Sequence, residues 1–252
     1  MKNTLSKCLL SNQSEFKFQY AAYLVKYPNY FDFSILELKS LMEMHNIPYY
    51  LNDDNNHNVR FDPFLRFKTK ERLNEKVINE LYQRAVLLKN IFQVYSKSNS
   101  FTELVSNVKS IKESNEENDL KSEIESNEFF KFMVEGCDKS FTKEEQKEMM
   151  EGLDFLQFKA AVNLSKASRV FVIYYNKPTD EYYFGKIIGE IPKGQCFYIK
   201  YDLNKRKYLG PTSLDNRLSF IMANLGKITS GDVVYDPFAG TGSILIPCSH
   251  FK

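Results

Sequence analysis

Short apolar runs alternate with amphipathic stretches over residues 18–104. Apolar runs rich in aromatic and β-branched residues predict strands, and apolar positions three and four residues apart predict helices. We therefore expect strands at residues 21–27, 48–51, 64–67 and 91–95, a helix over 35–45 capped by Ser34, and a helix that begins at Thr69 and runs to about residue 81. This mixture predicts a small α+β unit. The polar, unpatterned residues 1–17 predict a disordered tail.

A change of composition separates this unit from a second one. Residues 105–128 are rich in Glu, Ser, Asn and Lys and poor in aromatics, which favours a charged linker or an exposed helix. Residues 129–207 resume the apolar pattern, with strands expected at 129–134, 170–175 and 181–188 and a helix up to about residue 153 opened by a capping box of Thr142 and Glu145. The order strand, helix, strand, strand predicts a second compact α+β unit.

The third segment, residues 208–252, has a different organisation. We expect a helix over 214–225, with Thr212 or Ser213 as its cap, and a short apolar strand over 232–236. A glycine loop follows, and a helix begins at Ile244. A glycine loop between a strand and a helix is typical of the place where an open α/β sheet binds its ligand.

The loop between that strand and helix is the candidate binding site. It comprises Asp236, Pro237, Phe238, Ala239, Gly240, Thr241 and Gly242. A phosphate-binding P-loop needs a Lys after its last glycine and a dinucleotide fingerprint needs a third glycine, and the loop has neither. The carboxylate of Asp236 repels phosphate but suits an ammonium or a sulfonium group. S-adenosylmethionine carries both cations and is the expected cofactor; a glycine turn without a ligand is the alternative.

Composition and charge narrow the function classes. The 252 residues are 43% hydrophobic and 26% charged, as in globular proteins, and the net charge of +2 leaves nucleic-acid binding to local patches. No apolar run of about 18 residues and no signal-peptide pattern occurs, so we expect no membrane contact. Four scattered cysteines without a C-x-x-C pair argue against a zinc ribbon and a disulfide framework. A cytoplasmic protein without a metal site is the expectation.

Two basic clusters are candidates for phosphate contacts. The larger one lies between the second and third units and comprises Lys200, Lys205, Arg206 and Lys207; the smaller comprises Lys68, Lys70 and Arg72. A solvated loop is the alternative for each cluster. Contacts of these side chains to RNA phosphates would position the nucleic acid without reading its sequence.

Several blocks of the sequence together resemble the catalytic subunit of the eukaryotic and archaeal-type tRNA guanine-10 N2-methyltransferases. In chain order they are Tyr183-Phe184-Gly185, residues 200–208, Gly210-Pro211-Thr212-Ser213, Leu218-Ser219, Ala223-Asn224 and residues 235–243. The glycine loop alone would indicate only a methyltransferase, whereas the order and spacing of the blocks are specific to this family. The strand at Tyr23-Leu24-Val25 and the helix over 36–41 also fit.

The resemblance implies a fold and an activity. Residues 18–104 would form the family's N-terminal ferredoxin-like domain, 129–207 its THUMP RNA-binding domain, and 208–252 the start of its Rossmann-like methyltransferase domain. The activity would be S-adenosylmethionine-dependent methylation of the exocyclic N2 of the guanosine at position 10 of tRNA. Members of the family form a heterodimer with a small zinc-binding activator protein, so tRNA and this activator are the expected partners.

One part of the family's pattern is missing from the sequence. The family has an acidic residue that holds the cofactor ribose and, later, an Asp-Pro-Pro-Tyr block that orients the amine and stacks on an extruded base. This sequence has no such block, so we expect no catalytic residue within it, and expect an N-terminal portion of such an enzyme that binds cofactor weakly or not at all. A single parallel strand cannot bury its faces, so we also expect the helix over 214–225 to be poorly supported.

Two other functions stay open at this point. The chain could be a stand-alone tRNA-binding module with a vestigial methyltransferase edge. It could also resemble the amino-methyltransferases that act on adenine in DNA, which share the style of the glycine loop. A THUMP-like second unit disfavours the DNA substrate.

Overall fold

The computed structural model describes residues 15–51, 58–189, 197–208, 210 and 212–251. Its strands are β1 (Phe18–Leu24), β2 (Tyr49–Leu51), β3 (Phe64–Thr69), β4 (Leu88–Ser98), β5 (Phe130–Cys137), β6 (Arg169–Asn176) and β7 (Glu181–Ile187). Its α-helices are α1 (Phe31–Met44), α2 (Glu75–Tyr82), α3 (Phe101–Glu113), α4 (Asp119–Glu125), α5 (Lys143–Glu151), α6 (Asn216–Leu225) and α7 (Leu245–His250). Short 3₁₀ turns, η3 (Asp154–Leu156), η4 (Phe197–Tyr201) and η5 (Leu203–Lys205), complete the described elements.

All seven described strands belong to one sheet, in the order β2-β3-β1-β4-β7-β6-β5. Neighbouring strands are antiparallel except β5 and β6, which are parallel. The first four strands and the last three correspond to the two expected α+β units, and the β4–β7 pairing joins them across the middle. The α+β class is confirmed, but the two units share one sheet. The boundaries assigned to them stay a prediction.

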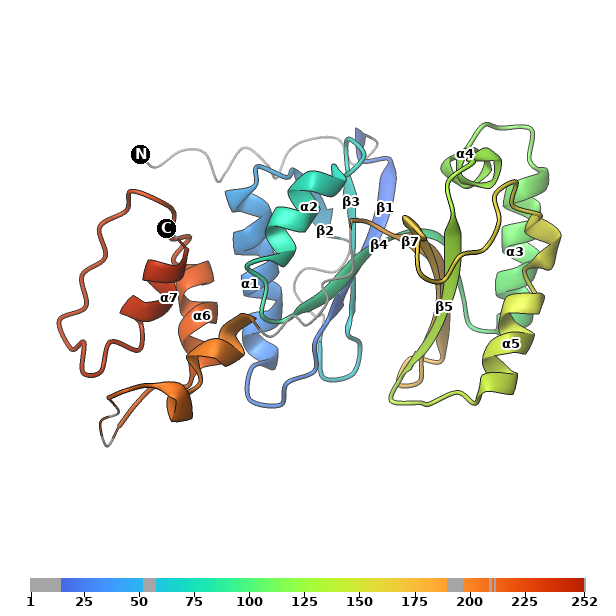
Figure 1. The fold of residues 1–252 in the computed structure, drawn as a ribbon. Coiled ribbons are helices and arrows are strands. Elements are labelled where there is room, and N and C mark those ends of the chain that lie inside the picture. Colours follow the sequence, from blue (N-terminus) through green and yellow to red (C-terminus); the bar gives the residue numbers. More distant parts are fainter. Residues whose placement is uncertain (1–14, 52–57, 190–196, 209, 211, 252) are drawn as a thin grey trace.

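One group of helices lies beside each half of the sheet (Figure 1), and both groups cover the same face of it. Helices α1 and α2 pack on the first half, around buried residues such as Tyr20, Leu41 and Ile78. Helices α3, α4 and α5 pack on the second half, around Phe171 and Phe184. A third cluster fills the remaining sheet face and brings together Tyr23, Phe64, Phe92, Tyr174 and Tyr183 from five strands. Because these rings come from both halves, the cluster fastens the halves together.

The seam between the halves leaves no room for a side chain at Gly185. A Cβ atom built on Gly185 of β7 would lie 2.0 Å from the carbonyl oxygen of Gln93 in β4. No larger residue fits there without moving a strand. Glycine at this position therefore permits the pairing that makes the sheet continuous.

The second half corrects the expectation of a charged linker. Residues 105–128 contain most of α3 and all of α4, and Leu104, Val108, Leu120 and Ile124 from these helices are buried in the second-half core. The apolar residues recur four apart within each helix, so one side of each helix is apolar although the composition is charged. The capping box of Thr142 and Glu145, the buried strand β6 and its hairpin with β7 are confirmed.

Three helix starts differ from the prediction. Helix α1 begins at Phe31 and not after Ser34, whose hydroxyl bonds back to the Tyr30 carbonyl. Thr69 belongs to β3, and α2 begins at Glu75 with Asn74 as its cap. Asp215 caps α6, in place of Thr212 or Ser213.

Helix α6 corrects the expectation that this helix lacks support. It packs on α1, and its Phe220 and Ile221 are fully buried. The residues around them come from the first half (Tyr27, Tyr30, Phe33, Val86 and Leu87), from η4 and from Phe251. The first half of the sheet and its helix α1 thus supply the apolar surface on which α6 packs. We had expected this surface to come from a methyltransferase sheet.

The expected strand over residues 232–236 is wrong for this structure. These residues form no strand, and Val233 and Tyr235 are 96% and 85% exposed. A parallel strand is stable only between neighbours that accept and donate its backbone hydrogen bonds. Among the described residues nothing pairs with this segment in a sheet. The helix expected after Ile244 is confirmed as α7.

Candidate functional site

The glycine loop has the backbone of an open binding turn. The carboxylate of Asp236 accepts a hydrogen bond from the Phe238 amide at 2.9 Å, and the Ala239 carbonyl accepts one from the Gly242 amide at 2.7 Å. Gly240 and Gly242 have φ angles of +54° and +75°, in the region that favours glycine. A Cβ atom on Gly242 would meet nothing within 4 Å. The loop therefore presents its backbone to open space.

Three contacts hold this loop in place. The hydroxyls of Ser213 and Thr241 lie 3.1 Å apart, and the Arg206 guanidinium donates to the Ser243 hydroxyl at 3.0 Å. At its end the loop runs into α7, whose His250 packs edge-on against Phe220 of α6. Residues before the loop and the helix after it thus fix both of its ends to α6 and its surroundings.

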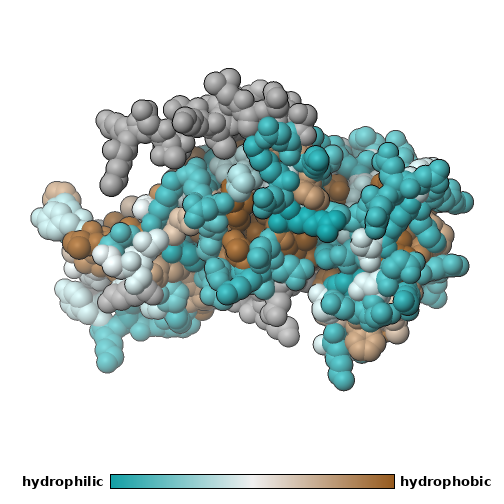
Figure 2. Space-filling view, turned by 90° about the horizontal axis from the view of Figure 1, so that it is seen from above, coloured by the Kyte–Doolittle hydropathy of each residue, from teal (hydrophilic) through white to brown (hydrophobic). Residues whose placement is uncertain are grey.

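The residues of the loop fit a cationic methyl donor. At Gly240 and Gly242 no side chain keeps a ligand away from the backbone, and the partly exposed Asp236 carboxylate supplies the negative charge. Phe238 is 91% exposed, so its ring is available to a ligand or to another protein surface. At the end of the molecule formed by this segment, hydrophobic and neutral residues interrupt the hydrophilic surface (Figure 2). Exposed apolar residues that lie together in this way mark a surface that binds a ligand or another protein surface.

The structure places the larger basic cluster beside the loop. Lys200, Lys205 and Lys207 are exposed on or next to η4 and η5. The Lys205 ammonium donates to the Ile199 carbonyl at 2.8 Å, and the Lys200 ammonium lies 4.9 Å from the ring of Tyr201. Arg206 differs from the three lysines, because it is half-buried and bonds Ser243. Three cations remain at the surface, with the Lys205 ammonium 4.0 Å from the Asp202 carboxylate, and the fourth donates to Ser243 at the end of the glycine loop.

The smaller basic cluster is largely neutralised by acids. Lys70 pairs with Glu15, and Arg72 pairs with Asp119 of α4. The second pair links the first half of the sheet to the second. These pairs favour a structural role for the cluster over phosphate binding.

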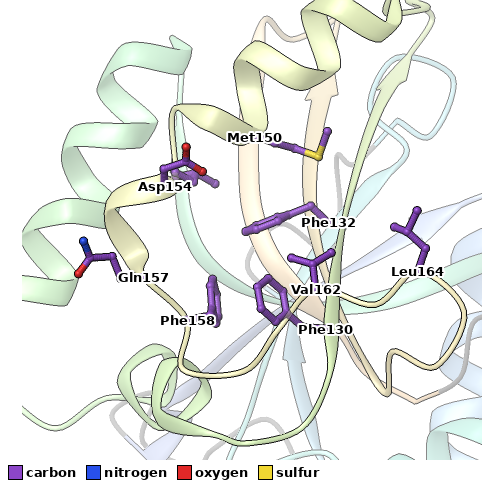
Figure 3. Close-up of a pocket in the computed structure, with 9 residues that line it drawn as sticks. Phe130, Phe132, Met150, Asp154, Gln157, Phe158, Val162 and Leu164 are labelled. Carbon is purple, nitrogen blue, oxygen red and sulfur yellow. The ribbon is translucent and has the colours of Figure 1, made fainter.

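A cavity of about 340 Å³ lies beside β5 (Figure 3). Its lining residues are mostly apolar: Phe130, Phe132, Met150, Leu153, Asp154, Gln157, Phe158, Val162 and Leu164. Its rings come from β5 and from the segment after η3, which crosses the end of the strand. The phenylalanines were visible in the sequence, but nothing in it indicated that the segment would leave a hollow.

Other kinds of site are absent from the described ranges. Among the residues that the structure describes, no three His, Cys, Asp or Glu side chains are grouped so as to hold a metal ion. Cys137 and Cys248 are buried free thiols, and burial raises the pKa of both. Among the helices that the structure describes, none is long and apolar enough to cross a membrane.

Comparison with known protein families gives two matches in chain order. A family model described as "Tmrp11 THUMP N-terminal domain" matches residues 21–190, and one described as "RMKL-like, methyltransferase domain" matches residues 204–249. The first covers both halves of the sheet and the second covers α6, the glycine loop and most of α7. The matches define the class: a THUMP-containing N-terminal module followed by part of a methyltransferase domain.

Curated relatives from human and yeast are both named as tRNA (guanine(10)-N(2))-methyltransferases. The chain is 35% identical to the tRNA (guanine(10)-N(2))-methyltransferase TRMT11 of Homo sapiens, over 71% of this chain and 39% of that protein. It is 30% identical to the tRNA (guanine(10)-N(2))-methyltransferase of Saccharomyces cerevisiae, over 92% of this chain and 53% of that protein. A solved structure, TrmN from Thermus thermophilus, matches with a TM-score of 0.48 and 15% identity, over 92% of this chain and 61% of that chain.

The chain belongs to the tRNA (guanine(10)-N(2))-methyltransferase family. It spans about two fifths to a half of the length of the curated relatives that it matches.

Proposed function

We propose that this chain is the tRNA-binding and cofactor-loop part of an S-adenosylmethionine-dependent tRNA methyltransferase that modifies N2 of guanosine 10. The observation that carries the proposal is the order of the two family matches, a THUMP module and then a methyltransferase start, on one chain. The open glycine loop with its acidic residue, anchored to the N-terminal half, supports it. The second family match does not favour the alternative, a tRNA-binding module without methyltransferase activity.

Transfer RNA is the proposed macromolecular partner, and Lys200, Lys205 and Lys207 are its proposed phosphate contacts. Their support is exposure and position, beside the loop that would hold the methyl donor. Arg206, which the sequence grouped with them, is proposed instead to hold the loop through Ser243. Contacts of this kind would set where the RNA lies without selecting its bases.

Charge reversal tests the RNA contacts. In Lys205→Glu/Lys207→Glu, tRNA affinity should fall and the slope of log K against log salt should shrink by about 2, because each lost phosphate contact removes about one unit. The matched control, Lys76→Glu/Lys109→Glu, makes the same change of charge at exposed positions on α2 and α3, outside the expected RNA-binding unit. Equal losses in the two variants would remove the basic cluster from the interface and leave only a general effect of charge.

S-adenosylmethionine is the proposed cofactor, held by the loop from Asp236 to Gly242. The carboxylate of Asp236 would attract its cationic groups, and the backbone at Gly240 and Gly242 would approach it closely. When bound, the cofactor supplies an electrophilic methyl group. The part of the chain described here contributes binding and position only, since no Asp-Pro-Pro-Tyr block occurs in the sequence.

Calorimetric titration with S-adenosylmethionine tests whether this chain alone forms a complete cofactor site. The 252-residue chain should bind S-adenosylmethionine more weakly than micromolar, because Val233 and Tyr235 lie in solvent where a binding sheet would need them. Micromolar binding by this chain alone would overturn that expectation. The small zinc-binding activator is proposed as a second partner, and the exposed apolar residues of this segment are a candidate contact for it.

A further inference from the structure

Glu37 is a carboxylate buried between the N-terminal half and the methyltransferase segment. It lies on α1 with 1% of its surface exposed. Its two oxygens accept hydrogen bonds from the Val86 amide at 3.2 Å and the Leu87 amide at 2.8 Å, just before β4. Its Oε1 also accepts one from the Asn224 side chain of α6 at 2.7 Å. The donors come from two parts of the chain more than 130 residues apart.

Asn224 extends this contact into a small network. Its Nδ2 donates to the Arg84 carbonyl at 2.8 Å as well as to Glu37, and its Oδ1 accepts from the Arg84 Nε at 3.3 Å. The Arg84 guanidinium lies 3.9 Å from the centre of the Phe251 ring, next to α7. Both helices of the methyltransferase segment therefore contact the same arginine.

Such a network is costly to bury. A carboxylate taken out of water loses hydration that hydrogen bonds only partly replace, and apolar residues of similar volume would hold two helices together at least as well. What a buried polar network adds is one defined geometry, since any displacement of α6 leaves a buried acceptor without its donor. Glu37 therefore suits a junction whose geometry matters.

We propose that Glu37 is a positioning residue that, with Asn224 and Arg84, locks α6 onto the N-terminal half and so holds the glycine loop at a fixed place on it. The loop follows α6 because α7 packs on α6 and Ser213 contacts Thr241. The consequence for methylation, a fixed separation between bound tRNA and bound methyl donor, rests on the proposed function. The attachment of α6 to the N-terminal half through Glu37 does not depend on the proposed function. An experiment can therefore contradict the attachment without contradicting the proposed function, and the reverse.

Protonation of Glu37 makes the contact between α6 and the N-terminal half depend on pH. Burial raises the pKa of Glu37 from 4.5 to about 7, and the hydrogen bonds from Asn224, Leu87 and Val86 and the charge of Arg84 oppose this rise. When α6 separates, Glu37 regains water and its pKa returns toward 4.5, so opening releases a proton between these values. The docked state is thus favoured at low pH, and this advantage is lost as pH rises through about 7.

Other titratable groups lie at the junction: His250 of α7 and His45, just after α1, both interact with Arg84, and burial lowers the pKa of each. The Glu37→Gln variant separates their titration from that of Glu37. Arg84 is the charged group that acts directly on the Glu37 carboxyl. Cys248 of α7 lies near Arg84, and burial keeps its thiol neutral by raising its pKa. Lys227, just after α6, pairs with Glu43 of α1 at the exposed end of the same helix contact. That pair joins the same two helices and provides a matched control.

Hydrogen exchange of the 252-residue chain tests the lock. With intrinsic exchange rates corrected, α6 should open about tenfold less often at pH 6 than at pH 8, whereas β6 should show no such dependence. Glu37→Gln cannot titrate and should abolish the dependence, and Glu43→Gln should leave it intact. Asn224→Ala should lower the protection of α6 at least about tenfold at pH 8 without changing β6, because it removes a hydrogen bond to a charged group.

Two results would overturn the proposal. One is a pH dependence of α6 that persists in Glu37→Gln, which would assign the proton to another group. The other is an Asn224→Ala variant in which α6 and β6 lose protection equally, or in which neither loses any. Equal loss would mean that the network supports the whole fold and not the position of α6.

Discussion

Removing the Leu120 side chain tests whether the charged stretch after β4 is part of the core. Leu120 lies on α4, is 1% exposed, and packs with Leu104, Val108 and Ile124. Truncation to Ala removes three buried carbons and leaves a cavity, which costs about 2–5 kcal/mol in cores of this kind. For a domain of this size that loss lowers the melting temperature by roughly 4–20 °C. A solvated linker would lose almost nothing.

The control for this experiment is the same substitution at an exposed site. Leu164 is 75% exposed, so Leu164→Ala should change the free energy of unfolding by less than about 0.5 kcal/mol. Both variants are measured by thermal and urea unfolding with circular dichroism. A Leu120→Ala protein as stable as Leu164→Ala would refute the packing of α4 described above.

Two further substitutions test the sheet seam and a helix cap. Gly185→Ala would place a Cβ atom 2.0 Å from the Gln93 carbonyl oxygen, so it should abolish folding or cost more than about 3 kcal/mol, whereas Gly226→Ala, whose nearest contact is 3.3 Å, should cost far less. Similar unfolding midpoints for the two would contradict the continuous sheet. Thr142→Ala removes the capping box of α5 and should cost about 1 kcal/mol by urea unfolding. An unchanged midpoint there would mean that the cap is frayed in solution.

Sequence patterns correctly predicted the elements that depend on interactions between residues close together in the chain. The capping box of Thr142 and Glu145 and the continuous apolar run that became β6 both carry their own signal. The charge-rich composition of residues 105–128 predicted a linker, and this was wrong because a few apolar residues such as Leu104 and Leu120 bury one side of each helix. An average of hydropathy over a stretch of sequence does not detect a helix whose apolar side consists of only two residues.

Long-range partners decided the rest. The apolar run at 232–236 forms a strand only between neighbours that the described residues do not supply. Helix α6 is supported by Glu37, 187 residues earlier in the sequence, and no spacing rule relates Glu37 to Asn224. For the candidate site, the sequence indicated the glycine loop and the basic cluster, but the bond from Arg206 to Ser243 required the structure.

Methylation by a chimeric enzyme tests the central claim most directly. This chain would replace the matched half of the Saccharomyces cerevisiae relative, in yeast lacking its own copy, and mass spectrometry would measure N2-methylguanosine at position 10 of tRNA. The account predicts that the modification returns, and that Asp236→Ala in the chimera removes it while tRNA binding persists. A folded chimera that binds tRNA as tightly as the yeast protein but leaves guanosine 10 unmethylated would contradict the account.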